Sequence, residues 1–93
     1  MPGARLDYPF GEDVAVYKVK DKMFALVAEK SDPVRISLKC DPLLAVTLRE
    51  KYESVMAGYH LNKKHWNTIV LSGQLDWPEI QGLIRLSYDL VAS

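Results

Sequence analysis

The sequence predicts an α+β domain, with a mainly antiparallel β-sheet and helices packed on it. Four short runs rich in β-branched and aromatic residues, bounded by turn residues, predict strands at residues 14–19, 23–28, 34–39 and 66–71. Two other segments each follow an aspartate and repeat their apolar residues at helical spacing, which predicts helices at residues 42–53 and from residue 77 onward. All 93 residues are expected to form one domain with the order ββ-β-α-β-α.

The first two strands are expected to form a hairpin. Residues 8–11 predict a turn before it, and Lys20 with Asp21 leaves room only for a tight connection between the strands. The strand at 23–28 has no polar alternation, so it is predicted to be buried on both faces of the sheet. The strand at 34–39 does alternate, which directs Val34, Ile36 and Leu38 inward and Arg35, Ser37 and Lys39 outward.

Each predicted helix carries a start signal. Asp41 can accept hydrogen bonds from free N–H groups as an N-cap, and Pro42 suits the first helical position. Asp76 lies three residues before Glu79, which is the spacing of a capping box. The core-facing positions are predicted to be Leu44, Leu48 and Tyr52 in the first helix and Ile80, Leu83, Ile84 and Val91 in the second.

Composition indicates a cytoplasmic protein of ordinary globular type. Cys40 is the single cysteine and has no partner for an internal disulfide, and no apolar run approaches the ~18 residues of a membrane helix. No apolar segment of the signal-peptide kind follows Met1. Twelve basic residues balance twelve acidic ones, which argues against a strongly basic nucleic-acid binder. Residues 54–75 contain no acid, however, so any attraction for an anion is expected there.

The residues suggest neither an enzyme nor a metal or cofactor site. His60 and His65 have no third ligand of suitable type beside them in the sequence, whereas zinc needs three or four. Cys40 with either histidine could mimic a nucleophile and its base, but a small buried cysteine at a strand end is the commoner case. The glycines are too scattered for a phosphate-binding loop.

The segment 59–67 is the unusual feature of the chain, because it interleaves aromatic rings, an amide and cations. Cations can neutralise phosphates, and rings or amides can meet bases, so the segment is a candidate nucleic-acid site. The alternative is a solvated turn whose ends are anchored in the core by Leu61 and Trp66. The candidate nucleic-acid-binding residues are His60, Asn62, Lys63, Lys64, His65, Trp66 and Lys39.

Nearly the whole chain resembles the bacterial MmcQ/YjbR family. The resemblance rests on residues 22–26, 37–42 with Leu48 and Arg49, and above all the string 58–68, which contains His-Leu-Asn-Lys-Lys-His-Trp. It implies a fold similar to the frataxin-like CyaY proteins, no enzymatic activity, and DNA binding through a "double wing" motif. The family signature falls on His60, Asn62, Lys63, His65 and Trp66 in this sequence.

The sequence departs from that family at its start, where members usually have a further helix ahead of the Pro-Gly matched by Pro2 and Gly3. Two predicted helices can cover one sheet face only, so an exposed apolar surface is expected. We therefore expect self-association, most simply a homodimer, or a marginally stable monomer. For function, the sequence favours a non-catalytic DNA-binding module, and the alternative is a protein-interaction or assembly domain.

Overall fold

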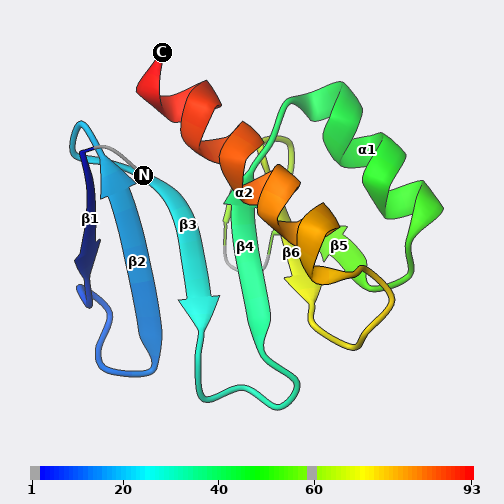
Figure 1. Ribbon diagram of the computed structural model, residues 1–93, viewed down its shortest axis with the longest axis horizontal. Coiled ribbons are helices and arrows are strands. Elements are labelled where there is room, and N and C mark those ends of the chain that lie inside the picture. The colour runs from blue at the N-terminus through cyan, green and yellow to red at the C-terminus, as the bar shows by residue number, and fades with distance from the viewer. Residues whose placement is uncertain (1–2, 59–60) are drawn as a thin grey trace.

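The computed structural model describes residues 3–58 and 61–93, which form one sheet with two helices packed on one of its faces (Figure 1). The strands are β1 (Ala4–Asp7), β2 (Val14–Val19), β3 (Lys22–Ala28), β4 (Arg35–Lys39), β5 (Val55–Ala57) and β6 (Trp66–Val70), and the helices are α1 (Pro42–Lys51) and α2 (Trp77–Ala92). The strand order is β1-β2-β3-β4-β6-β5, and every neighbouring pair is antiparallel. The predicted α+β class is confirmed.

In the left half of the sheet in Figure 1, β2 and β3 form a hairpin with a tight turn and a bulge. Lys20 and Asp21 have φ angles of 52° and 62°, the left-handed values that a two-residue hairpin turn needs to match the strand twist. The register shifts between Tyr17 and Lys18, which leaves Phe24 as an extra residue on β3. The Phe24 ring meets Tyr88 of α2 edge-on at 5.4 Å between centroids, so the bulge ties the hairpin to the helix layer.

The core lies between the two helices and the sheet face that they cover, which we call the helix face. Side chains alternate along each strand, so Leu38 and Asn67, which are direct partners, both belong to the helix face together with Ile36 and Ile69. The buried core is Val19, Phe24, Ala25, Ile36, Leu38, Val55, Ile69, Leu75, Ile80 and Val91. Of the predicted core positions, Ile80 and Val91 belong to this cluster, and Leu48, Tyr52, Leu83 and Ile84 pack against it. Leu44 is half-buried and lies outside the cluster, and the buried residue of α1 is Ala45.

The opposite face of the sheet, which we call the open face, corrects two predictions. In β3, Leu26 is only half-buried, so the expected burial of this strand on both faces was wrong. Ser37 was expected to point to solvent, but it is buried and its Oγ lies 2.8 Å from Oγ1 of Thr68 on β6. This mutual hydrogen bond makes the buried pair tolerable, because a hydroxyl without a partner would destabilise the face.

Two strands and one boundary differ from the sequence analysis. Strand β1 is almost entirely exposed and β5 has three residues, so neither carries the apolar alternation that marks a strand in sequence. Both are strands because they pair with β2 and β6. Helix α1 ends at Lys51 rather than near Glu53, since Tyr52 adopts an extended conformation. Helix α2 begins as predicted, with Asp76 Oδ1 accepting a hydrogen bond from Glu79 N at 3.0 Å.

Helix α2 crosses the sheet diagonally and leaves the helix face beside β1 and β2 uncovered (Figure 1). An apolar groove of about 590 Å³ lies there, lined in part by Tyr17, Phe24 and Ile84. At its margin, Leu6 and Trp77 expose 51% and 55% of their surface. The uncovered apolar surface thus lies on the helix face, beside α2, whereas the sequence analysis expected it on the face without helices. Within the described residues, neither helix has the length and apolar character needed to cross a membrane.

Candidate nucleic-acid interface

The sheet register gathers basic residues at one end of the molecule. The β2–β3 turn, the end of β4 and the start of β6 meet there, because Lys39 pairs with Trp66 while β3 runs antiparallel to both of its neighbours. We call this the basic end, and it lies at the top of Figure 1. Its cationic residues, taken from the described chain, are Arg5, Lys18, Lys20, Lys22, Lys39, Lys63, Lys64 and His65.

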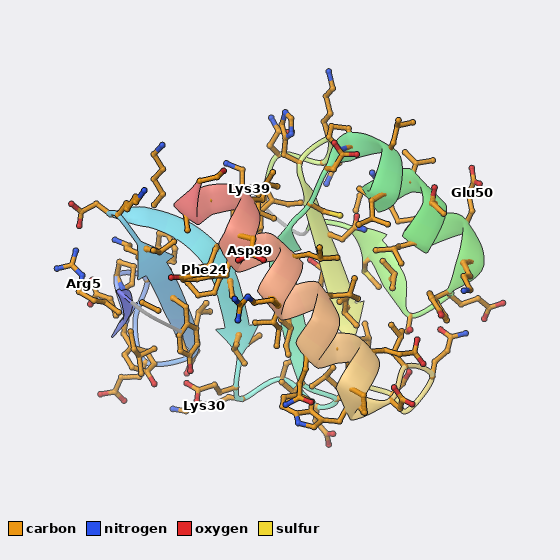
Figure 2. The ribbon with its side chains drawn as sticks, turned by 45° about the horizontal axis from the view of Figure 1, so that its top comes forward. Arg5, Phe24, Lys30, Lys39, Glu50 and Asp89 are labelled. Atoms are coloured by element: carbon orange, nitrogen blue, oxygen red, sulfur yellow. The ribbon has the colours of Figure 1, made fainter. Side chains whose placement is uncertain are left out.

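Acidic residues gather at the opposite end of the sheet. That end contains the β3–β4 connection, the approach to β2 and the start of α2, with Asp7, Glu12, Asp13, Glu29, Asp32, Glu53, Asp76 and Glu79. Figure 2 labels Lys39 at the basic end and Lys30 at the opposite, acidic end. Although the net charge of the chain is zero, its positive and negative side chains are thus separated along the strand direction.

The few acids at the basic end are already engaged. Asp21 forms an ion pair with Arg5 across the β2–β3 turn. Asp41 caps α1, and its Oδ2 accepts hydrogen bonds from Leu43 N and Leu44 N at 3.1 and 3.4 Å. Within the described chain, the side-chain nitrogens of Lys22, Lys39 and Lys64 have no hydrogen bond or ion pair, so they are available to an anion.

We call residues 61–67 the signature segment, and residues 62–65 within it form a turn that hydrogen bonds stabilise. Asn62 Oδ1 accepts a hydrogen bond from Lys64 N at 2.9 Å, and the Asn62 carbonyl accepts from His65 N at 3.3 Å. An asparagine suits this position because its side chain can mimic a backbone acceptor two residues along the chain. The Asn62 side chain therefore stabilises the turn through its oxygen. The side-chain N–H groups of this exposed residue take no part in that hydrogen bond.

Neighbouring elements fix where this turn lies. Arg49 on α1 donates from Nη2 to the Lys63 carbonyl at 3.1 Å, and Cys40 N donates to the His65 carbonyl at 2.8 Å. Lys63 Nζ donates to the Gly58 carbonyl at 3.4 Å, so this ammonium group helps to stabilise the segment. Trp66 is only 7% exposed, which makes its ring a support beneath the segment.

The sequence-predicted site residues therefore fall into three groups. Lys64, His65 and the half-exposed Lys39 present their side chains at the basic end. Asn62, Lys63 and Trp66 hold or support the turn. His60 lies outside the described residues. The sequence analysis missed Lys20 and Lys22, because only the strand pairing reveals that the first hairpin turn shares an end with residue 39.

Cys40 is in a poor environment for a nucleophile. Burial raises the pKa of its thiol, and the nearby Asp41 carboxylate raises it further, although Arg49 acts in the opposite direction. A raised pKa keeps the thiol protonated, whereas a reactive cysteine needs the thiolate. Among residues 3–58 and 61–93, no group of three or more histidine, cysteine or acidic side chains is arranged to hold a metal ion.

Comparison with known proteins relates the whole chain to one family. The YjbR family model matches residues 1–90. The chain is 38% identical to the uncharacterised protein YjbR of Escherichia coli strain K12, over 94% of this chain and 74% of that protein. It is 34% identical to the uncharacterised protein YbdF of Escherichia coli O157:H7, over 98% of this chain and 75% of that protein.

Solved structures agree with this relationship. The crystal structure of Deinococcus radiodurans protein DR2400, described as a DUF419 domain, superposes with a TM-score of 0.95 at 40% identity, covering all of this chain and 71% of that one. The crystal structure of a Pseudomonas syringae protein gives a TM-score of 0.80 at 36% identity, over 95% of this chain and 86% of that one. The family assignment made from the sequence is confirmed: the chain belongs to the YjbR family.

Proposed function

We propose that this protein is a non-catalytic DNA-binding module that contacts the phosphate backbone with its basic end. The observation that carries the proposal is the separation of charge along the strands, which brings lysines of β2, β3, β4, the β2–β3 turn and the turn before β6 to one end. Phosphate contacts position a protein on a duplex without reading its sequence. A DNA ligand is also consistent with the cytoplasmic location that the composition predicts.

The strength of such binding follows from the number of available cations. Lys22, Lys39 and Lys64 have unpaired side chains, Lys20 donates to the Ala92 carbonyl at 2.7 Å, and Lys63 serves the turn. About 2–4 phosphate contacts would give a log–log salt slope of roughly −2 to −4. Because few cations are available and phosphate contacts carry no sequence information, we expect weak binding with little sequence preference.

The experiment compares two charge-matched variants. Lys22→Gln, Lys39→Gln and Lys64→Gln together remove three cations from the basic end. Lys30→Gln, Arg35→Gln and Lys51→Gln together remove three cations elsewhere, so both variants have the same net charge. Fluorescence anisotropy with duplex DNA at several salt concentrations should show a slope shallower by about one for each lost phosphate contact in the first variant. The control variant should keep the parent slope.

Two results would contradict the proposal. Equal losses in both variants would mean that net charge alone governs binding, and the basic end would have no special role. Absence of binding by the parent protein at low salt would remove DNA as a ligand of this chain.

A protein-interaction domain remains the second candidate, and one observation favours it. Asn62, Lys63 and Trp66, three of the signature positions, are engaged in holding the turn. A signature of this kind can preserve a shape that a partner protein recognises. Under this alternative, the parent protein fails to bind DNA at low salt, while substitution of Asn62 still lowers its stability.

A further inference from the structure

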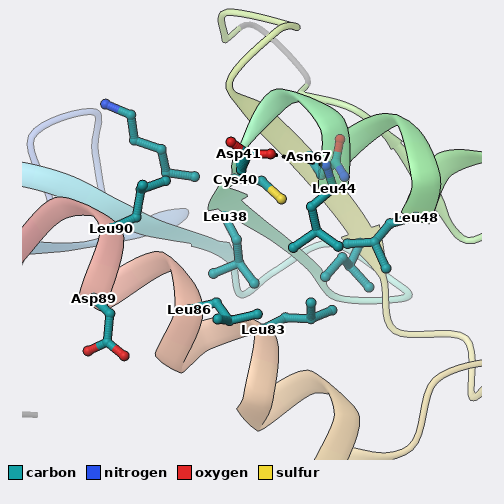
Figure 3. Close-up of a pocket in the computed structure, with 12 residues that line it drawn as sticks. Leu38, Cys40, Asp41, Leu44, Leu48, Asn67, Leu83, Leu86, Asp89 and Leu90 are labelled. Carbon is teal, nitrogen blue, oxygen red and sulfur yellow. Dashed lines mark hydrogen bonds between the residues drawn. The ribbon is translucent and has the colours of Figure 1, made fainter.

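Hollows large enough for a small molecule lie on both faces of the sheet. On the helix face, leucines form much of the wall of the groove between α1 and α2 (Figure 3). The acids that line this groove already have partners, since Asp41 caps α1 and Asp89 forms an ion pair with Arg85 at 3.3 Å. A pocket on the open face differs, because two polar side chains that line it have no partner within the described residues.

The open-face pocket, as we call it, is bordered by two loops. Strand register places Val16, Ser37 and Thr68 in one row across the face opposite the helices. Val16 is nevertheless fully buried, and Thr68 is only 1% exposed. Phe10 from the loop before β2 and Leu61 from the signature segment line the pocket beside this row. The pocket has a volume of about 430 Å³, within the range of small-molecule pockets.

Arg35 of β4 lines this pocket and has apolar neighbours on both sides. Its direct strand partners are Ala28 of β3 and Val70 of β6, so neither offers it a carboxylate. The Arg35 side chain is exposed, and its guanidinium forms no hydrogen bond or ion pair with the part of the chain that the structure describes. Ser31 also lines the pocket, and its hydroxyl, unpaired among the same residues, is accessible to solvent. The pocket thus has two hydrogen-bond donors that a bound molecule can reach.

The charge around the pocket restricts what it can bind. Arg35 lies at the acidic end of the sheet, where the negative potential opposes a polyanion such as DNA. Asp13, an acid of that end, pairs with Lys30 at 3.3 Å. Glu29, another, accepts a hydrogen bond from Tyr8 Oη at 3.0 Å. A ligand with one negative charge and an apolar body meets less repulsion here than a polyanion and gains from contact with the apolar floor.

We propose that the open-face pocket binds a small apolar carboxylate. The carboxylate accepts hydrogen bonds from the guanidinium of Arg35 and the hydroxyl of Ser31, and the apolar body lies against Val14 and Leu26. A guanidinium suits this ligand because its planar fork can donate two parallel N–H hydrogen bonds to one carboxylate. The inference goes beyond DNA binding, because the pocket lies on the open face and its lining includes none of the three lysines removed from the basic end.

The test compares three compounds that separate charge from apolar contact. 3-Phenylpropanoate has both features, 3-phenylpropanol has the same body without the charge, and propanoate has the charge without the ring. Titration of each into the isotopically labelled full chain at neutral pH, followed by amide NMR shifts, gives its dissociation constant. We expect 3-phenylpropanoate to shift amides of β3 and β4 and to bind about tenfold or more tightly than either of the other two.

Charge-matched variants then identify the cation. Arg35→Gln changes an exposed side chain and should bind 3-phenylpropanoate and 3-phenylpropanol within about twofold of each other. Lys30→Gln removes a cation from the same end but outside the pocket and should keep the parent preference. The triple variant Lys22→Gln, Lys39→Gln and Lys64→Gln should also keep it.

Three results would overturn the proposal. Equal binding of 3-phenylpropanoate and 3-phenylpropanol by the parent protein would remove the role of Arg35. A preference lost equally in Lys30→Gln, or lost in the triple lysine variant, would mean that overall charge or the basic end attracts the anion. Failure of 3-phenylpropanoate to bind the parent protein would remove the site.

Discussion

Gly58 offers a sharp test of how the signature segment is held. A Cβ added to this residue would lie 2.6 Å from the Cβ of Trp66 and 3.2 Å from that of Leu61. Carbon atoms prefer about 3.5–4.0 Å, so the alanine in a Gly58→Ala variant would have to move roughly 1 Å. Neither of the crowding atoms can swing aside by rotating, because a Cβ is fixed to the backbone.

The hydrogen bonds around Gly58 limit that movement. Gly58 N donates to the Trp66 carbonyl at 2.9 Å, and the Gly58 carbonyl accepts from Leu61 N and from Lys63 Nζ, each at 3.4 Å. Since Trp66 is buried, the strand cannot retreat without opening the core. Overpacking of this kind usually destabilises a domain by about 1–3 kcal/mol, and we expect Gly58→Ala to fall in that range.

Gly82 provides the matched control. It lies within α2, its residue is exposed, and an added Cβ would meet nothing within 4 Å. Gly82→Ala should therefore stabilise the protein by about 0.5–1 kcal/mol, the advantage of alanine over glycine inside a helix. Urea denaturation of both variants measures the two free energies of unfolding. If Gly58→Ala unfolded at the same urea concentration as the parent protein, Gly58 would not be closely packed against Trp66.

Trp66, Cys40 and the groove beside β1 and β2 can each be tested as well. Trp66→Ala should lower the free energy of unfolding by about 3–5 kcal/mol because the ring is buried, whereas Lys63→Ala with Lys64→Ala should change it by only about 0.5 kcal/mol; thermal or urea denaturation compares them. Burial raises the pKa of Cys40, so the folded state keeps this proton to a higher pH than the unfolded chain does. The contribution of this thiol to stability is complete below the ordinary thiol pKa and is lost as the pH rises above that value. The free energy of unfolding, measured by urea denaturation across the alkaline range, should therefore fall less steeply with pH in Cys40→Ala than in the parent protein. The uncovered apolar groove beside β1 and β2 predicts self-association, most simply as a dimer, and a sedimentation coefficient that stays monomeric at all concentrations would contradict it.

Local chemistry in the sequence was enough to predict most of the fold. Asp41 and Asp76 mark the two helix starts because a carboxylate accepts from N–H groups that the first turn leaves free, and both do so in the structure. The strands at 14–19, 23–28, 34–39 and 66–71 were predicted from their β-branched and aromatic residues, which pack well on a pleated, half-buried surface. The segment 59–67 was identified as unusual because its residue types are unusual, and the family relationship followed from the same string.

The tertiary structure decided what depends on residues distant in the chain. Strands β1 and β5 have little apolar pattern of their own and exist through pairing with β2 and β6. The role of Ser37 required Thr68, thirty-one positions away, because a hydroxyl is buried only where a partner satisfies it. The basic end and the apolar neighbours of Arg35 arise in the same way. Sequence order determines which groups exist, while strand register and helix placement determine which of them share a surface or lack a partner.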